Sequence, residues 1–137
     1  MPDSVALEPD VAQPAIRVAV VDDHALVRAT VRLVVGHASD LEWVGEAVDG
    51  SEAADLVARS RPDVVLMDLS MPEVDGFSAT RDIIRSWPDT RVLVLTSSAE
   101  PDHVLLSLEA GAVGVLRKDG DIATILDGIR AAVKRTR

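Results

Sequence analysis

The chain has 137 residues, which is enough for one domain with a single hydrophobic core. Apolar residues make up 47 %, no apolar run reaches membrane-spanning length, and the lack of cysteine excludes disulfides and thiol chemistry. The formal charge of −9, from 23 acidic and 14 basic residues, argues against nucleic-acid binding by this chain alone.

The two ends differ in composition from the body of the chain. Residues 1–15 carry three prolines and neither a basic start nor an apolar stretch, so we expect a flexible tail and no signal or transit peptide. With no export signal, a cytoplasmic location is the default expectation. Residues 16–133 form the predicted domain, and the basic residues 134–137 are its end or a linker stub.

The first part of the domain alternates between strand-like and helix-like segments. Ile16–Val21 is short and rich in β-branched residues, which predicts a strand, and residues 22–37 then follow a helical period. Residues 42–47 predict a weaker second strand. The next helix is expected over residues 51–61, with Ser51 as its capping residue.

The same alternation continues to the end of the domain. The remaining expected elements are strands at 63–67, 91–95 and 112–116 and helices at 77–87, 101–111 and 122–133. Strands that are apolar along their whole length and separated by helices indicate a parallel sheet with both faces covered. The sequence therefore predicts an α/β domain with a doubly wound five-stranded parallel sheet.

Polar residues follow four of the five predicted strands. Asp22 and Asp23 follow the first strand, Asp68 the third, Thr96 the fourth and Lys118 the fifth. Taken singly, Asp23 suits a helix N-cap, Thr96 a strand edge and Lys118 a solvated surface. Asp68 is harder to explain in this way, because four apolar residues precede it. Since ligands bind at the carboxyl ends of parallel strands, the joint pattern indicates one site.

The chemistry that suits this set of residues is phosphoryl transfer to a carboxylate. Three clustered acids repel one another unless a cation compensates, and oxygen ligands of this kind favour Mg²⁺. The metal ion would neutralise charge on an incoming phosphoryl group while Asp68 attacks phosphorus in line. Lys118 would supply a second positive charge, and Thr96 a hydrogen bond to the attached group.

The segments "VVDDH", "VVLMDLSMPEVDG", "VLVLTSS" and "GAVGVLRKD" together resemble the receiver domain of bacterial two-component response regulators, over about Ile16 to Val133. The resemblance implies a flavodoxin-like (β/α)5 fold with strand order 2-1-3-4-5. It also implies a phosphoacceptor signalling domain that assists its own phosphorylation and dephosphorylation and is not a conventional enzyme.

The resemblance assigns roles by position in this sequence. Asp68 corresponds to the phosphoacceptor, Thr96 to the switch hydroxyl and Lys118 to the phosphoryl contact. The implied Mg²⁺ ligands are the carboxylates of Asp22, Asp23 and Asp68 and the main-chain carbonyl of Ser70. Pro72 and Gly76 correspond to the loop after the acceptor, where a fixed φ and an unhindered backbone shape the turn.

The motifs are most similar to receivers that precede a LuxR-type helix-turn-helix domain, which is absent from this chain. The implied output is transcriptional control through such a domain. The implied phosphoryl donor is a cognate sensor histidine kinase. The resemblance is also compatible with a homodimer that forms on phosphorylation, and it implies no membrane partner. The implied output surface comprises the fourth and fifth helices and the strand between them. One position departs from the pattern: Val115 stands where the family often has tyrosine or phenylalanine.

Two rival interpretations remain. A Mg²⁺-dependent phosphohydrolase of the haloacid dehalogenase type would need acids two positions apart after the first strand, whereas here they are adjacent. A degenerate receiver that works as a constitutive interaction surface would not need the complete acid, hydroxyl and lysine set.

Four further residues are expected to have no part in the site. His24 and His103 are expected to be surface histidines, and Trp43 and Trp87 are expected to be packing residues.

Overall fold

The structure, a computed structural model, describes residues 14–97 and 100–134. The predicted tail at 1–15 and the predicted end at 134–137 lie almost wholly outside the described residues, so both stay predictions. Among the described residues, none of the helices is long and apolar enough to cross a membrane.

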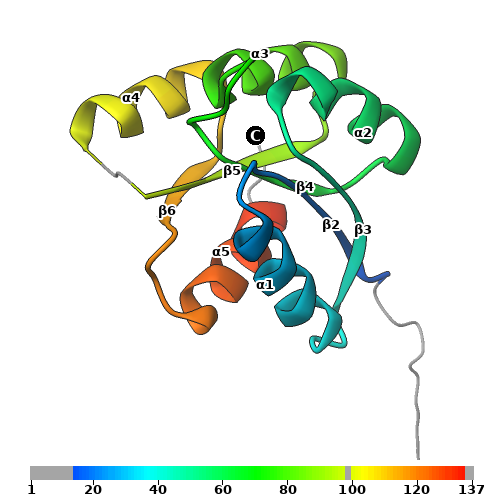
Figure 1. Cartoon of the computed structure of the whole chain (residues 1–137). Coiled ribbons are helices and arrows are strands. Elements are labelled where there is room, and N and C mark those ends of the chain that lie inside the picture. The colour runs from blue at the N-terminus through cyan, green and yellow to red at the C-terminus, as the bar shows by residue number, and fades with distance from the viewer. Residues whose placement is uncertain (1–13, 98–99, 135–137) are drawn as a thin grey trace, which may run out of the picture.

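Strands and helices alternate along the described chain (Figure 1). The strands are β2 (Ile16–Val21), β3 (Leu41–Ala47), β4 (Val64–Met67), β5 (Arg91–Thr96) and β6 (Gly114–Arg117). The helices are α1 (Ala25–Gly36), the 3₁₀ turn η2 (Gly50–Glu52), α2 (Ala53–Ser60), α3 (Gly76–Ser86), α4 (Pro101–Ala110) and α5 (Ile122–Lys134). All strand pairs are parallel, and the order β3-β2-β4-β5-β6 confirms the predicted order 2-1-3-4-5.

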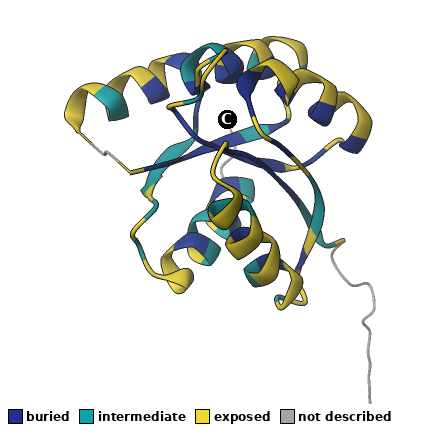
Figure 2. Ribbon diagram, viewed as in Figure 1, coloured by how far each residue is buried: buried dark blue, intermediate teal, exposed yellow. Residues whose placement is uncertain are grey.

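Helices cover both faces of the sheet. Figure 1 shows α2, α3 and α4 on one face and α1 and α5 on the other. The central strands are buried on both sides, and their helices turn exposed surfaces outward (Figure 2). Every residue of β4 is at most 1 % exposed. Each such side chain contributes about 1.5–3 kcal/mol by its burial, so the position of Asp68, the residue after β4, is firmly fixed.

Trp43 and Trp87 pack against the two halves of the core, as predicted. The second strand, β3, is a full strand of seven residues, although the sequence predicted only a weak one. A β-bulge interrupts its pairing, because Val18 pairs with Trp43 but Ala19 pairs with Gly45. The bulge breaks the alternation of buried and exposed residues, which explains the weak sequence signal.

The prediction that Ser51 caps the second helix is wrong. Asp49 lies before the 3₁₀ turn that precedes α2, and its carboxylate accepts a hydrogen bond from the Ser51 N–H at 2.9 Å. The fifth strand was also placed too early, since β6 runs from Gly114 to Arg117 instead of 112–116. Gly114, the first residue of β6, weakened the strand pattern in the sequence.

Candidate phosphoryl and metal site

The sheet register places the predicted acids side by side. Val21 pairs with Met67 in neighbouring strands, so Asp22 and Asp68 leave the sheet together, and the Asp68 N–H donates to the Val21 carbonyl at 2.9 Å. On the other side of β4, Thr96 ends β5 and pairs with Arg117, the last residue of β6. Lys118 follows directly, and its N–H donates to the Thr96 carbonyl at 2.8 Å.

Asp68 is a buried carboxylate with an incomplete set of partners. Its side chain is 4 % exposed. Oδ1 lies 3.1 Å from the Lys118 ammonium and accepts a long contact of 3.5 Å from the Ser70 N–H. Oδ2 has no hydrogen-bond partner among the described residues. Burial and the nearby charge of Asp22 raise the pKa of Asp68, and the Lys118 charge offsets this only in part.

Lys118 joins two of the acids. Its ammonium lies 2.9 Å from Asp22 Oδ2 and 3.1 Å from Asp68 Oδ1, with 12 % of the side chain exposed. Burial disfavours the charge, but the carboxylates of Asp22 and Asp68 outweigh burial and raise the pKa of Lys118. The lysine is therefore a fixed cation of the site, and the interpretation of a solvated surface lysine is wrong.

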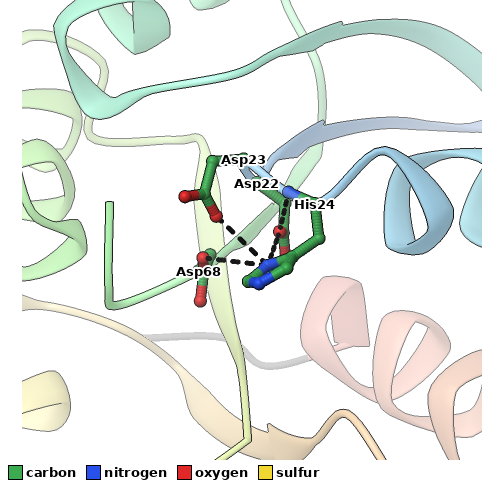
Figure 3. Close-up of side chains that lie close together, drawn as sticks. All are labelled: Asp22, Asp23, His24 and Asp68. Atoms are coloured by element: carbon green, nitrogen blue, oxygen red, sulfur yellow. Dashed lines mark hydrogen bonds and ion pairs between the residues drawn. The ribbon is translucent and has the colours of Figure 1, made fainter. Parts of the chain in front are cut away.

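Asp23 is not the helix N-cap that its position suggested. His24 occupies that position before α1, and Asp22 Oδ1 accepts the His24 N–H at 2.8 Å. The Asp23 carboxylate faces the ring of His24 instead, with Oδ1 3.1 Å from the ring nitrogen Nδ1. His24 was expected to be a surface residue, and 61 % of its side chain is indeed exposed. However, its ring nitrogen Nδ1 points into the acid cluster (Figure 3).

The donor set fits a hard divalent cation. Asp22, Asp23, His24 and Asp68 each offer one ligand atom, and these atoms all lie within 4.8 Å of one another. Two of the three carboxylates, those of Asp22 and Asp68, share the Lys118 ammonium, so the ionised site keeps a negative charge that a divalent ion would neutralise. The unpartnered, buried Oδ2 of Asp68 is a further reason to expect a cation, because burying such an atom without a partner is costly.

The loop after Asp68 is held by a residue that the sequence interpretation missed. Asp49 is 7 % exposed, and its carboxylate accepts hydrogen bonds from the N–H groups of Glu73 at 3.0 Å and Val74 at 3.1 Å. Burial opposes its charge, but these N–H groups and that of Ser51 outweigh burial and lower the pKa of Asp49. The only sequence signal was an aspartate before the turn residues "GS".

The remaining predicted site residues lie next to this loop and the sheet edge. Ser70, two residues after Asp68, is exposed, and Thr96 is 4 % exposed at the end of β5. Val115 and Phe77 are half-buried and pack against a small cluster that includes Leu69. His103, expected at the surface, is half-buried, and its ring centre lies 6.4 Å from that of Phe77.

Comparisons with known proteins identify the family of this chain. Residues 18–130 match the model of the response regulator receiver domain family. The transcriptional regulatory protein LiaR of Bacillus subtilis is 44 % identical over 119 residues, which cover 87 % of this chain and 56 % of that protein. Response regulator GacA of Pseudomonas viridiflava is 40 % identical over 115 residues, covering 84 % of this chain and 54 % of that protein.

Solved receiver structures have the same fold as this chain. The receiver domain of the putative response regulator NarL from Mycobacterium tuberculosis has a TM-score of 0.84 and 35 % identity, over 90 % of this chain and 100 % of that chain. The response regulator domain of Thermotoga maritima CheB has a TM-score of 0.83 and 30 % identity, over 90 % of this chain and 99 % of that chain. The chain spans about half the length of the curated relatives it matches. It belongs to the family of receiver domains of two-component response regulators.

Proposed function

We propose that Asp68 of this receiver domain accepts a phosphoryl group from a cognate sensor histidine kinase, in a reaction that needs Mg²⁺. The observation that carries the proposal is the Asp68 carboxylate itself. It is buried at the end of β4, it lies 3.1 Å from the Lys118 ammonium, and its Oδ2 has no hydrogen-bond partner among the described residues. A buried carboxylate in this state is expected to have a chemical role.

The transfer is an in-line displacement at phosphorus. One Asp68 oxygen forms the new P–O bond, and the bond from phosphorus to the donor breaks, with its electron pair leaving on the donor. The carboxylates of Asp22, Asp23 and Asp68 and the Ser70 carbonyl would hold Mg²⁺, which would supply positive charge for the phosphoryl oxygens. Lys118 contacts the same oxygens, and the Thr96 hydroxyl donates to the attached group. By the same groups, the domain assists its own dephosphorylation.

The output is proposed to be transcriptional. Several curated relatives are transcriptional regulatory proteins, and a structure similar to this chain is described as a response regulator of the LuxR family from Aurantimonas. We infer that phosphorylation controls a helix-turn-helix domain outside the receiver, with homodimer formation on phosphorylation. The charge of −9 supports our expectation that this chain does not itself bind DNA, and a cytoplasmic location stays a prediction.

Intact mass spectrometry after incubation with acetyl phosphate and Mg²⁺ tests the acceptor. Wild type is expected to gain one phosphoryl mass, and Asp68→Asn none. Asp75→Asn is the matched control: Asp75 caps α3 from an exposed position in the following loop, and asparagine caps equally well. Wild-type labelling of Asp68→Asn, or equal labelling with and without a chelator, would refute the proposal.

A further inference from the structure

His24 gives the acid cluster a nitrogen atom. Its ring Nδ1 lies 2.9 Å from Asp22 Oδ1, 3.1 Å from Asp23 Oδ1 and 4.0 Å from Asp68 Oδ2. Each of the three acids thus turns one carboxylate oxygen toward it (Figure 3). The rest of the ring is exposed, since 61 % of the side chain is accessible. The edge of the imidazole that carries Nδ1 therefore points into the site.

These separations agree with positions around one octahedral ion. With ligands about 2.1 Å from such an ion, neighbouring ligand atoms are about 3.0 Å apart and opposite ones about 4.2 Å apart. The two short separations from Nδ1 match neighbours, and the 4.0 Å separation from Asp68 Oδ2 matches an opposite pair. Without a change of rotamer, the nitrogen therefore lies where a ligand of such an ion would lie, although the four candidate ligand atoms, which lie within 4.8 Å of one another, would have to draw slightly closer around it.

A simple hydrogen bond does not explain the contacts of Nδ1, because the Lys118 ammonium also lies 3.2 Å from it. If Nδ1 carries a proton, it donates to the carboxylates but faces the donor groups of Lys118. If Nδ1 carries a lone pair, it accepts from Lys118 but faces the oxygens of Asp22 and Asp23. A cation among these atoms satisfies both the nitrogen lone pair and the carboxylates.

We propose that His24 is an additional metal ligand, which makes this site bind imidazole-favouring divalent ions such as Ni²⁺ more tightly than carboxylates and carbonyls alone would. The inference rests on the metal site of the proposed function. Mg²⁺ prefers oxygen and gains little from the ring, whereas Ni²⁺ is well matched to imidazole. His24 thereby sets which divalent ion occupies the receiver when several are present.

One competing arrangement makes the opposite prediction. In it, the imidazole only fills the place of the cation and must swing out before any metal binds. Replacing the imidazole with a ring that the carboxylates do not attract would then strengthen the binding of Mg²⁺ and Ni²⁺ alike. A ligand role instead predicts that Ni²⁺ binding weakens while Mg²⁺ binding is unchanged.

Calorimetric titration of the purified chain with Mg²⁺ and with Ni²⁺ distinguishes these outcomes. His24→Phe keeps a ring of similar size and has no ligand atom. His37→Phe is the matched control, because His37 follows the same helix and its Nδ1 contacts the Leu33 carbonyl, away from the acids. For His24→Phe we expect Ni²⁺ affinity to fall at least tenfold and Mg²⁺ affinity to stay within twofold. For His37→Phe we expect wild-type values for both ions at the site.

Pulsed electron paramagnetic resonance of Mn²⁺ bound to the wild-type chain tests the ligand without relying on a variant. We expect modulation from a directly bound nitrogen, which changes when the histidines carry ¹⁵N and is lost in His24→Phe but not in His37→Phe. Modulation that does not respond to ¹⁵N-histidine, unchanged Ni²⁺ affinity, or tighter binding of both ions in His24→Phe would overturn the inference while leaving the Mg²⁺ site intact. A wild-type chain that binds neither Mg²⁺ nor Ni²⁺ would overturn the metal site of the proposed function as well.

Discussion

Replacing Gly76 with alanine tests how closely the start of α3 fits against the phosphoacceptor. A Cβ at this position would lie 2.1 Å from the Asp68 carbonyl oxygen, 2.8 Å from the Leu69 Cα and 2.9 Å from the Asp68 carbonyl carbon. All three are backbone atoms, so no side-chain rotation relieves the overlap. A normal carbon–oxygen contact is about 3.3 Å, which means that helix and strand end must separate by roughly 1 Å.

Gly36→Ala is the matched control, because a Cβ there meets no heavy atom within 4 Å and the residue ends α1. Alanine in a compatible helical position stabilises by about 0.4–1 kcal/mol. The same gain at Gly76 is outweighed by overpacking, which costs about 1–3 kcal/mol. We therefore expect the free energy of unfolding of Gly76→Ala to lie about 1–3 kcal/mol below that of Gly36→Ala.

Urea unfolding measures the stability difference, and acetyl phosphate labelling followed by intact mass measures the effect on the site. A shift of about 1 Å at reacting groups can slow a reaction by roughly 100-fold, so Gly76→Ala is expected to label far more slowly than Gly36→Ala. If Gly76→Ala is as stable as the control and labels at the wild-type rate, the reasoning from close packing is refuted.

Three further predictions concern the rest of the site. Asp23→Asn should weaken Mg²⁺ binding in a calorimetric titration without altering the urea midpoint, because the helix cap lies at the next residue; equal Mg²⁺ affinity would contradict a ligand role. Asp49→Ala should lower the free energy of unfolding by about 2–3 kcal/mol at neutral pH. Since the folded-state pKa of Asp49 is lowered, its contribution is present above the ordinary carboxyl pKa and is lost as pH falls through the lowered value, so the two proteins should converge in acid. On beryllofluoride activation, amide shifts should be largest over residues 96–106 and side-chain changes at Val115 minor; a rotamer change there as large as the loop response would contradict this.

The fold and the clustering of Asp22, Asp68 and Lys118 could be predicted because they depend on local patterns. Apolar runs located the strands, and parallel pairing brings their carboxyl ends to one edge whatever the details of the loops. The order and polarity of the strand ends were therefore enough to predict that Asp22, Asp68 and Lys118 lie together. Their neighbours in sequence identified them, since each polar residue directly follows a strand.

What could not be predicted depends on contacts between distant segments. The role of Asp49 is set by N–H groups 24 and 25 residues further along, in a loop whose shape the sequence does not specify. His24 was correctly expected at the surface, but the sequence did not show that its ring nitrogen Nδ1 faces the carboxylates of Asp22 and Asp23. The displaced capping residue and the bulge in β3 likewise reflect tertiary fit overriding local propensity.

The contacts of Lys118 connect the chemistry to the proposed output surface. Before modification, its ammonium is shared between Asp22 and Asp68, and ionising Asp68 in this buried position costs folding free energy, as its raised pKa indicates. A phosphoryl group on Asp68 moves negative charge outward from the strand end, and the ammonium is expected to follow it. The backbone N–H of Lys118 is bound to the Thr96 carbonyl, so the displacement acts on the joined ends of β5 and β6. Because valine at position 115 is stiff and small, we expect this backbone connection, and not an aromatic ring, to carry the change from the site to the ends of β5 and β6.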